Sequence, residues 1–119
     1  MNTDTITRGV EELRARYAND IQVAQDGTRT LVAVKDITLP PGCRPTSTDI
    51  LLVLDPAQPK PQHYVRPGQT ASNGQPPKNN STTLVGGESW MTFSYNIPYQ
   101  EGDSLARFIT MVRQRLEKP

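Results

Sequence analysis

Few side chains in this sequence could carry out chemistry, and they lie far apart along the chain. Three consecutive hydroxyl residues, Ser81, Thr82 and Thr83, are candidate nucleophiles, although a hydroxyl needs a general base to remove its proton. His63 is the one histidine and is the natural candidate for that base. No acidic partner stands at a fixed spacing from His63. A packed strand histidine and a solvated row of hydroxyls are therefore the simpler interpretations.

Cys43 is the one cysteine, and it follows two prolines and a glycine. A nucleophilic thiol needs a base, a cation or a helix N-terminus that lowers its pKa, and only Arg44 is adjacent. We therefore expect Cys43 to be a small, partly buried loop residue. A single cysteine excludes an intrachain disulfide, and one histidine disfavours a metal site. The sequence predicts neither a metal nor a cofactor.

The composition narrows the possible partners. Lys and Arg number 13 against 12 Asp and Glu, which gives a net charge of +1. Proteins that bind nucleic acid or anionic membranes rely on clustered positive charge, so neither partner is expected. The glycines form no phosphate-binding motif. No apolar run approaches the ~20 residues of a membrane span and the N-terminus shows no export signal, so we expect a cytoplasmic protein.

Two amphipathic helices are predicted near the ends of the chain. The first has an apolar face made by Ile6, Val10, Leu13 and Tyr17. Its possible capping residues are Asp4, Thr5 and Thr7. The second helix has the clearer pattern, with an apolar face made by Leu105, Phe108, Ile109, Val112 and Leu116. It is expected to be capped by Ser104 or Asp103.

Strands are predicted between the two helices. Ile21–Gln25 and Thr28–Asp36 flank Asp26-Gly27, a pair typical of a type I′ hairpin turn. Asp49–Leu54 is the most apolar stretch and is expected to be buried on both faces. Gln62–Val65 is a short fourth strand. The sequence therefore predicts a single α+β domain over residues 1–119, with helices packed against an antiparallel sheet.

A long polar segment follows the predicted strands. Residues 66–83 are rich in Gly, Pro, Asn, Ser and Thr and show neither helical nor strand periodicity. A stretch of this length without structure of its own is usually functional or disordered. The next stretch, Leu84–Tyr99, is rich in aromatic residues and is expected to pack on the core as irregular structure or a short strand.

Several segments, taken in order, resemble a known family. They are Leu39–Cys43, Asp49–Pro56, Tyr64–Pro67, Trp90–Asn96 and the helix that follows Asp103. The series resembles the bacterial branch of the ubiquitin-conjugating enzyme (UBC-like) superfamily, in particular the group called prokaryotic family E. The resemblance implies a UBC-like fold: an N-terminal helix, a four-stranded antiparallel meander, a long active-site-type loop at residues 66–83 and a C-terminal helix.

The resemblance also implies transfer of a ubiquitin-like protein. In the superfamily a loop cysteine accepts the modifier from an activating enzyme as a thioester, and an asparagine with nearby amides stabilises the oxyanion. The corresponding window here, Asn79–Leu84, contains no cysteine. The implied nucleophiles are therefore the hydroxyls of Ser81, Thr82 and Thr83, with Asn80 and His63 in support. The implied partners are a ubiquitin-like modifier, a ThiF-like activating enzyme and a deconjugating peptidase.

Three functional interpretations follow from this pattern. The protein is an inactive conjugating-enzyme relative that binds a modifier, or a noncanonical transferase that holds the modifier as an oxyester on a hydroxyl. Both belong to bacterial conjugation pathways of the kind found in antiphage defence or stress operons. The third interpretation is an unrelated α+β protein-binding module without enzymatic activity.

Overall fold

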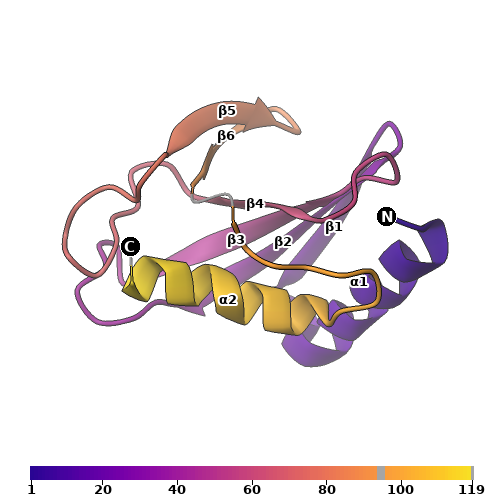
Figure 1. Ribbon diagram of the computed structural model, residues 1–119, viewed down its shortest axis with the longest axis horizontal. Coiled ribbons are helices and arrows are strands. Elements are labelled where there is room, and N and C mark those ends of the chain that lie inside the picture. The colour runs from indigo at the N-terminus through magenta and orange to yellow at the C-terminus, as the bar shows by residue number, and fades with distance from the viewer. Residues whose placement is uncertain (94–95, 119) are drawn as a thin grey trace.

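The computed structural model describes residues 1–93 and 96–118. The chain begins with helix α1 (Thr3–Tyr17) and a short 3-10 helix η1 (Ala18–Asp20), and it ends with helix α2 (Leu105–Glu117). Six strands lie between them: β1 (Ile21–Asp26), β2 (Arg29–Thr38), β3 (Ser47–Leu54), β4 (Gln62–Val65), β5 (Ser81–Val85) and β6 (Glu88–Thr92). They form one antiparallel sheet in the order β1-β2-β3-β4-β6-β5 (Figure 1). The α+β class is confirmed.

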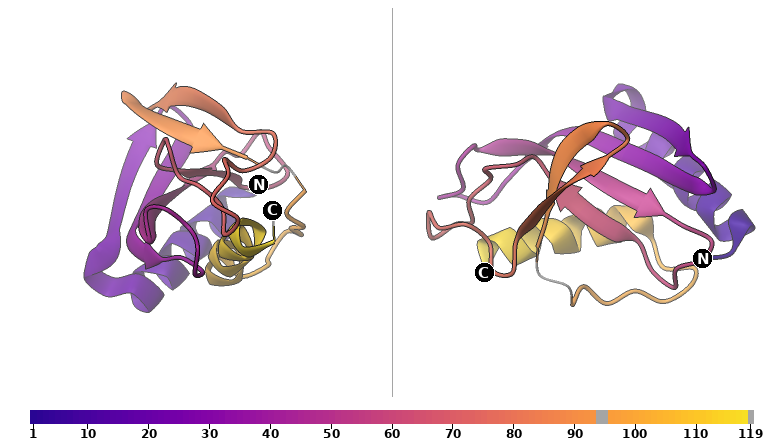
Figure 2. Two further views of the ribbon diagram at one scale, coloured as in Figure 1. Left: turned by 90° about the vertical axis from the view of Figure 1, so that its left-hand side faces the viewer. Right: turned by 90° about the horizontal axis from the view of Figure 1, so that it is seen from above.

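The sheet differs from the predicted four-stranded meander by the hairpin β5–β6. The prediction that Ser81–Thr83 end a segment without regular structure is wrong, because these residues begin β5. The first four residues of β5 are exposed, so the strand lacks the alternation of apolar and polar residues that reveals a half-buried strand. The hairpin curls over the face of the sheet opposite to α2 (Figure 2).

The two helices begin at capped positions, of which one was predicted. The side chain of Ser104 accepts a hydrogen bond from the amide of Arg107 and caps α2, as expected. The cap of α1 is Asn2, whose Oδ1 lies 2.7 Å from the amide nitrogen of Asp4. The predicted caps Asp4, Thr5 and Thr7 are wrong, since all three lie inside the helix, where a side chain cannot precede the free amides.

The hairpin of β1 and β2 is shifted by one residue from the prediction. Asp26 pairs with Arg29, so the two central turn residues are Gly27 and Thr28. Only Gly27 has a positive φ, at 64°. A type I′ turn requires positive φ at both central positions, whereas type II′ requires it at the first. The predicted type I′ turn over Asp26-Gly27 is therefore wrong.

β3 is buried on both faces, as its sequence predicted. Ile50, Leu52 and Leu54 face the main core, which lies between the sheet and the two helices. Leu51 and Val53 face the other side, where they belong to a smaller core with Leu31, Val85 and Trp90. The hairpin β5–β6 thus covers part of the sheet face that the helices leave open, and it carries Trp90 into the second core.

The polar segment that precedes β5 is attached to the C-terminal end of α2. The amide of Ser72 donates to the carbonyl of Leu116 over 2.8 Å, and its hydroxyl donates to the carbonyl of Glu117 over 2.6 Å. These bonds satisfy carbonyls that a helix end leaves without intrahelical partners. The amide of Thr70 also donates to the carbonyl of Arg44 over 2.8 Å. The segment therefore packs as a defined loop.

The aromatic stretch Leu84–Tyr99 packs on the core, as expected, where the structure describes it. Trp90, Phe93 and Ile97 are buried, while Ser94 and Tyr95 lie outside the described residues. Neither helix is long and apolar enough to cross a membrane, within the described parts of the chain.

Candidate functional site

The three candidate hydroxyls lie along the exposed strand β5. Its register places Thr82 opposite Met91 and Thr83 opposite Trp90. Because successive side chains of a strand point to opposite faces, Thr82 points away from the face that Ser81 and Thr83 share. In the described parts of the chain no side chain accepts a hydrogen bond from these hydroxyls. The three hydroxyls are exposed, but they are not activated as nucleophiles, because no general base among the described residues is in contact with them.

Asn80, which was predicted to support the hydroxyls, takes part in the turn that precedes β5. Its Nδ2 donates to the carbonyl of Pro77 over 2.8 Å. The preceding residue, Asn79, has a φ of 57°, a left-handed conformation that asparagine tolerates better than most residues. The Asn80 amide therefore holds the chain reversal in place.

His63 is buried in the main core beneath α2. Its Nε2 lies 2.6 Å from the carbonyl oxygen of Phe93, so Nε2 carries the proton and donates it to that oxygen. The ring also makes edge contacts with Phe93 and Phe108. Burial, reinforced by the charges of Lys60 and Arg115, lowers the pKa of His63 to about 4. A neutral, enclosed imidazole that bonds a core carbonyl makes no contact with the hydroxyls of β5.

Cys43 is fully buried, deeper than the sequence predicted. Its Sγ lies 4.0 Å from the carbonyl oxygen of Leu116, near the C-terminal end of α2. Burial raises the pKa of the Cys43 thiol. A protonated thiol that is closed off from solvent cannot attack a substrate, because the thiolate is the nucleophile.

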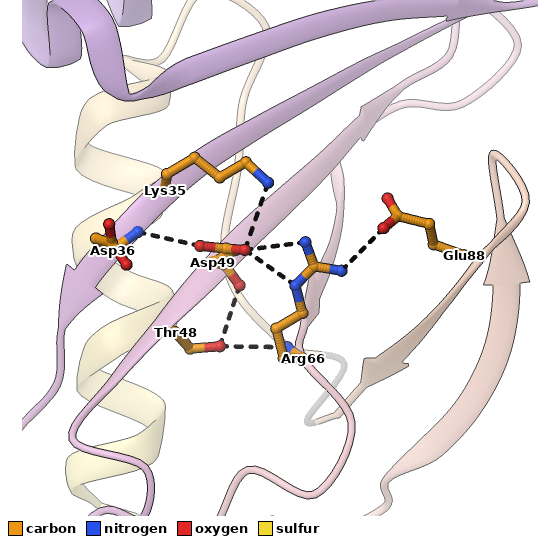
Figure 3. Close-up of polar contacts among 6 residues, drawn as sticks. All are labelled: Lys35, Asp36, Thr48, Asp49, Arg66 and Glu88. Atoms are coloured by element: carbon orange, nitrogen blue, oxygen red, sulfur yellow. Dashed lines mark hydrogen bonds and ion pairs between the residues drawn. The ribbon is translucent and has the colours of Figure 1, made fainter.

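A charged cluster centred on Asp49 lies where β3 begins and β4 ends. β2 contains a bulge at this point, where Lys35 and Asp36 together oppose Asp49. Oδ1 of Asp49 accepts a hydrogen bond from the backbone amide of Asp36, over 3.1 Å, and Oδ2 lies 3.5 Å from Nζ of Lys35. It also receives Nε and Nη2 of Arg66 at 3.0 and 2.9 Å (Figure 3).

These contacts decide the charge state of Asp49. Burial raises the pKa of its carboxyl, but hydrogen bonds from the Asp36 amide and Arg66, together with the charges of Lys35 and Arg66, outweigh burial. The pKa of Asp49 is therefore lowered overall. Asp49 is therefore an anion whose charge is balanced by two cations and whose carboxylate accepts a hydrogen bond from an amide. The cluster has a structural role, because it holds β2, β3 and the end of β4 together.

Arg66 extends this cluster to the hairpin. Its Nη1 lies 3.5 Å from the Glu88 carboxylate at the start of β6 (Figure 3). Its guanidinium lies over the indole ring of Trp90, with Cζ 4.0 Å from the ring centroid. The Arg66 side chain therefore connects the end of β4 with β3 and with the hairpin β5–β6.

A groove opens beside this cluster, on the face that the helices leave uncovered. It encloses about 410 Å³, and its walls include Val23, Leu31, Leu51, Val85 and Trp90. Gln22 and Glu88 also line the groove. An apolar groove with few polar groups favours contact with an apolar surface over acid–base chemistry.

Sequence reasoning missed the cluster because no local pattern reports it. Asp49 and Arg66 stand 17 positions apart, and no spacing pattern in the sequence relates them. Residues 1–93 and 96–118 contain no group of three or more His, Cys, Asp or Glu side chains that could hold a metal ion.

Comparison with protein-family models, with curated proteins and with solved structures returned no match.

Proposed function

We propose that the protein is a non-catalytic relative of ubiquitin-conjugating enzymes, which binds a ubiquitin-like modifier in a bacterial conjugation pathway. One observation carries the non-catalytic part of this proposal: the single cysteine, Cys43, is fully buried against the end of α2. A thioester on Cys43 would require the core to open. The modifier, a ThiF-like activating enzyme and a deconjugating peptidase come to this proposal from the sequence resemblance.

The arrangement of elements supports the proposal. A helix, four antiparallel strands, a loop and a C-terminal helix follow one another as the resemblance implies, and the hairpin β5–β6, between the loop and α2, is an addition to that order. The sheet face opposite to the helices offers an apolar groove and an exposed hairpin, which are features of a binding surface. A fold by itself supports many functions, so the binding experiment is the decisive test.

A second candidate function is transfer through an oxyester on β5. The observation in its favour is that Ser81, Thr82 and Thr83 are all exposed, so that a large acyl donor could reach them. The observation against it is the absence of any base in contact with them among the described residues.

Both candidates are tested in one reaction. The protein is mixed with the modifier, the activating enzyme and ATP, and the products are separated with and without reductant. We expect saturable binding of the modifier and no covalent adduct. Ser81→Ala, Thr82→Ala and Thr83→Ala variants serve as controls for hydroxyl chemistry, and Cys43→Ala serves for thiol chemistry.

The other outcomes separate the remaining interpretations. An adduct that resists reductant, yields to hydroxylamine and disappears in one hydroxyl variant would establish the oxyester transferase. A reductant-sensitive adduct that disappears in Cys43→Ala would overturn the non-catalytic proposal. Neither binding nor adduct would favour an unrelated α+β protein-binding module.

A further inference from the structure

β5 is the last strand of the sheet and is paired on one side only. Natural proteins usually protect such edges with charged side chains, proline, bulges or a covering element. β5 contains no charged residue and no proline, and its register with β6 is continuous. Leu84, at 71% exposure, is the one large hydrophobic side chain that the described residues expose. The strand therefore has the properties of an edge that pairs with another chain.

The turn after β5 determines which of its backbone groups face outward. Gly86 and Gly87 both have positive φ, at 59° and 83°, which is the pattern of a type I′ turn. Such a two-residue turn is closed by a hydrogen-bonded pair, here Val85 and Glu88.

Hydrogen-bonded and non-bonded pairs alternate along an antiparallel ladder. Counting back from Val85, Thr83 and Ser81 also bond to β6. The N–H and C=O groups of Thr82 and Leu84 consequently point away from the sheet. Each copy of the chain thus presents two donors and two acceptors along its free edge.

We infer that β5 pairs with β5 of a second copy of this chain, antiparallel, around a two-fold axis at Thr83. In this register Thr82 of one copy faces Leu84 of the other, and both such pairs are hydrogen-bonded. The register satisfies all the outward groups of both strands and stays within Ser81–Val85. It gives a closed dimer, because a two-fold contact between identical edges leaves no further β5 to pair.

The side chains of β5 suit this register. The methyl group of Thr82 on one copy would cover the exposed Leu84 of the other. The two Thr83 residues form the central non-bonded pair, in which side chains approach most closely. Facing threonines make favourable cross-strand pairs.

The charges that flank β5 favour antiparallel pairing. Lys78 precedes the strand by three residues and Glu88 follows it by three, and both side chains are exposed. An antiparallel dimer brings the Lys78 end of one copy to the Glu88 end of the other. A parallel arrangement would bring like charges together, which is unfavourable.

The inference does not depend on the proposed function. A dimer would place the strand that carries Ser81, Thr82 and Thr83 inside an interface, whether or not a modifier binds elsewhere. Failure of modifier binding and failure of dimerisation are read in separate experiments.

The oligomeric state tests the inference directly. Sedimentation of the full chain over concentrations up to about 1 mM should show a reversible monomer–dimer equilibrium. Leu84→Lys and Thr82→Lys should each raise the dimer dissociation constant about tenfold or more, because a charged edge opposes pairing. Thr28→Lys adds the same charge in the exposed β1–β2 turn and should leave the constant unchanged. A wild-type chain that stays monomeric, or a dimer that Leu84→Lys does not weaken, would overturn the inference.

Amide hydrogen exchange tests the register. In the monomer the amides of Thr82 and Leu84 should exchange quickly, while those of Thr83 and Val85 are protected by β6. Dimerisation should protect Thr82 and Leu84 selectively. A dimer in which these two amides stay unprotected would show that the copies meet at another surface.

Charge reversal tests the direction of pairing. Lys78→Glu should weaken the dimer more than Lys78→Gln does, because it places a negative charge beside the Glu88 end of the other copy. Equal dissociation constants for these two variants would contradict the antiparallel arrangement.

Discussion

The guanidinium of Arg66 lies over the ring of Trp90, with Cζ 4.0 Å from the ring centroid, while its Nε and Nη2 bind the carboxylate of Asp49. This stack joins the two halves of the sheet, because Arg66 follows β4 and Trp90 belongs to β6. The described ladder between β4 and β6 rests on a single residue pair, Val65 and Met91. The position of the hairpin therefore depends strongly on the side chain of Arg66.

Substitutions of Arg66 should lower the free energy of unfolding, and Arg66→Ala should lower it more than Arg66→Lys. Arg66→Lys keeps the charge but loses the planar stack on Trp90 and the paired hydrogen bonds to Asp49, at a cost of about 1 kcal/mol. Arg66→Ala should cost about 2 kcal/mol, because it leaves Asp49 with fewer partners. Urea unfolding followed by circular dichroism measures both. Arg16→Ala removes a longer and exposed contact, 5.4 Å from the Tyr17 ring centroid, and should cost less than about 0.5 kcal/mol. Equal losses for Arg16 and Arg66 would contradict this role.

His63 should make stability depend on pH between about 6.5 and 4. Its pKa is about 4 in the folded chain and 6.5 ordinarily, so the unfolded chain binds the proton more readily in this window. The contribution of neutral His63 to the free energy of unfolding is fully present above pH 6.5. It decreases as the pH falls, and the loss reaches about 3 kcal/mol near pH 4.

The His63→Gln variant isolates this contribution, because glutamine can still donate to the Phe93 carbonyl but does not titrate. The difference in unfolding free energy between the wild type and this variant should shrink steadily from pH 7 to pH 4.5. A difference that stays constant over this range would show that His63 is accessible to protons in the folded state.

Glu12 on α1 should stabilise the start of α2. Its carboxylate accepts the amides of Leu105 and Ala106 at 2.9 and 3.3 Å, and it also accepts the hydroxyl of Ser104. These are amides that a helix start leaves free, and a negative charge there is favoured by the helix dipole. Glu12→Ala should cost about 1–2 kcal/mol in thermal or urea unfolding. The neighbouring exposed Glu11→Ala serves as the control and should change stability by less than about 0.5 kcal/mol.

Gly42 should tolerate no side chain. It has a φ of 94°, and a Cβ added there would lie 2.1 Å from the carbonyl oxygen of Ser72. Gly74 also has a positive φ, of 77°, but a Cβ at that position meets nothing within 4 Å. Gly74→Ala should therefore cost only the free energy of holding alanine at a positive φ, about 1 kcal/mol. Gly42→Ala should cost about 2 kcal/mol more, because its Cβ would also overlap the Ser72 carbonyl oxygen. Equal costs would show that the Ser72 loop moves aside freely.

The sequence alone was sufficient to predict the elements in which apolar residues recur at a regular spacing. Both helices and the double-sided burial of β3 were predictable, because a repeated apolar residue records directly which face of an element avoids water. Cys43 was also correctly predicted to lie in a loop, although its depth of burial was not predicted.

The tertiary structure decided everything that depends on partners distant in the sequence. β5 has a polar, exposed sequence and becomes a strand only because two glycines turn the chain back to pair it with β6. Asp49 and Arg66 meet because β3 and β4 are neighbours, and burial beneath α2 lowers the pKa of His63. Burial and charge pairing are properties of the assembled layers, and no short stretch of sequence records them.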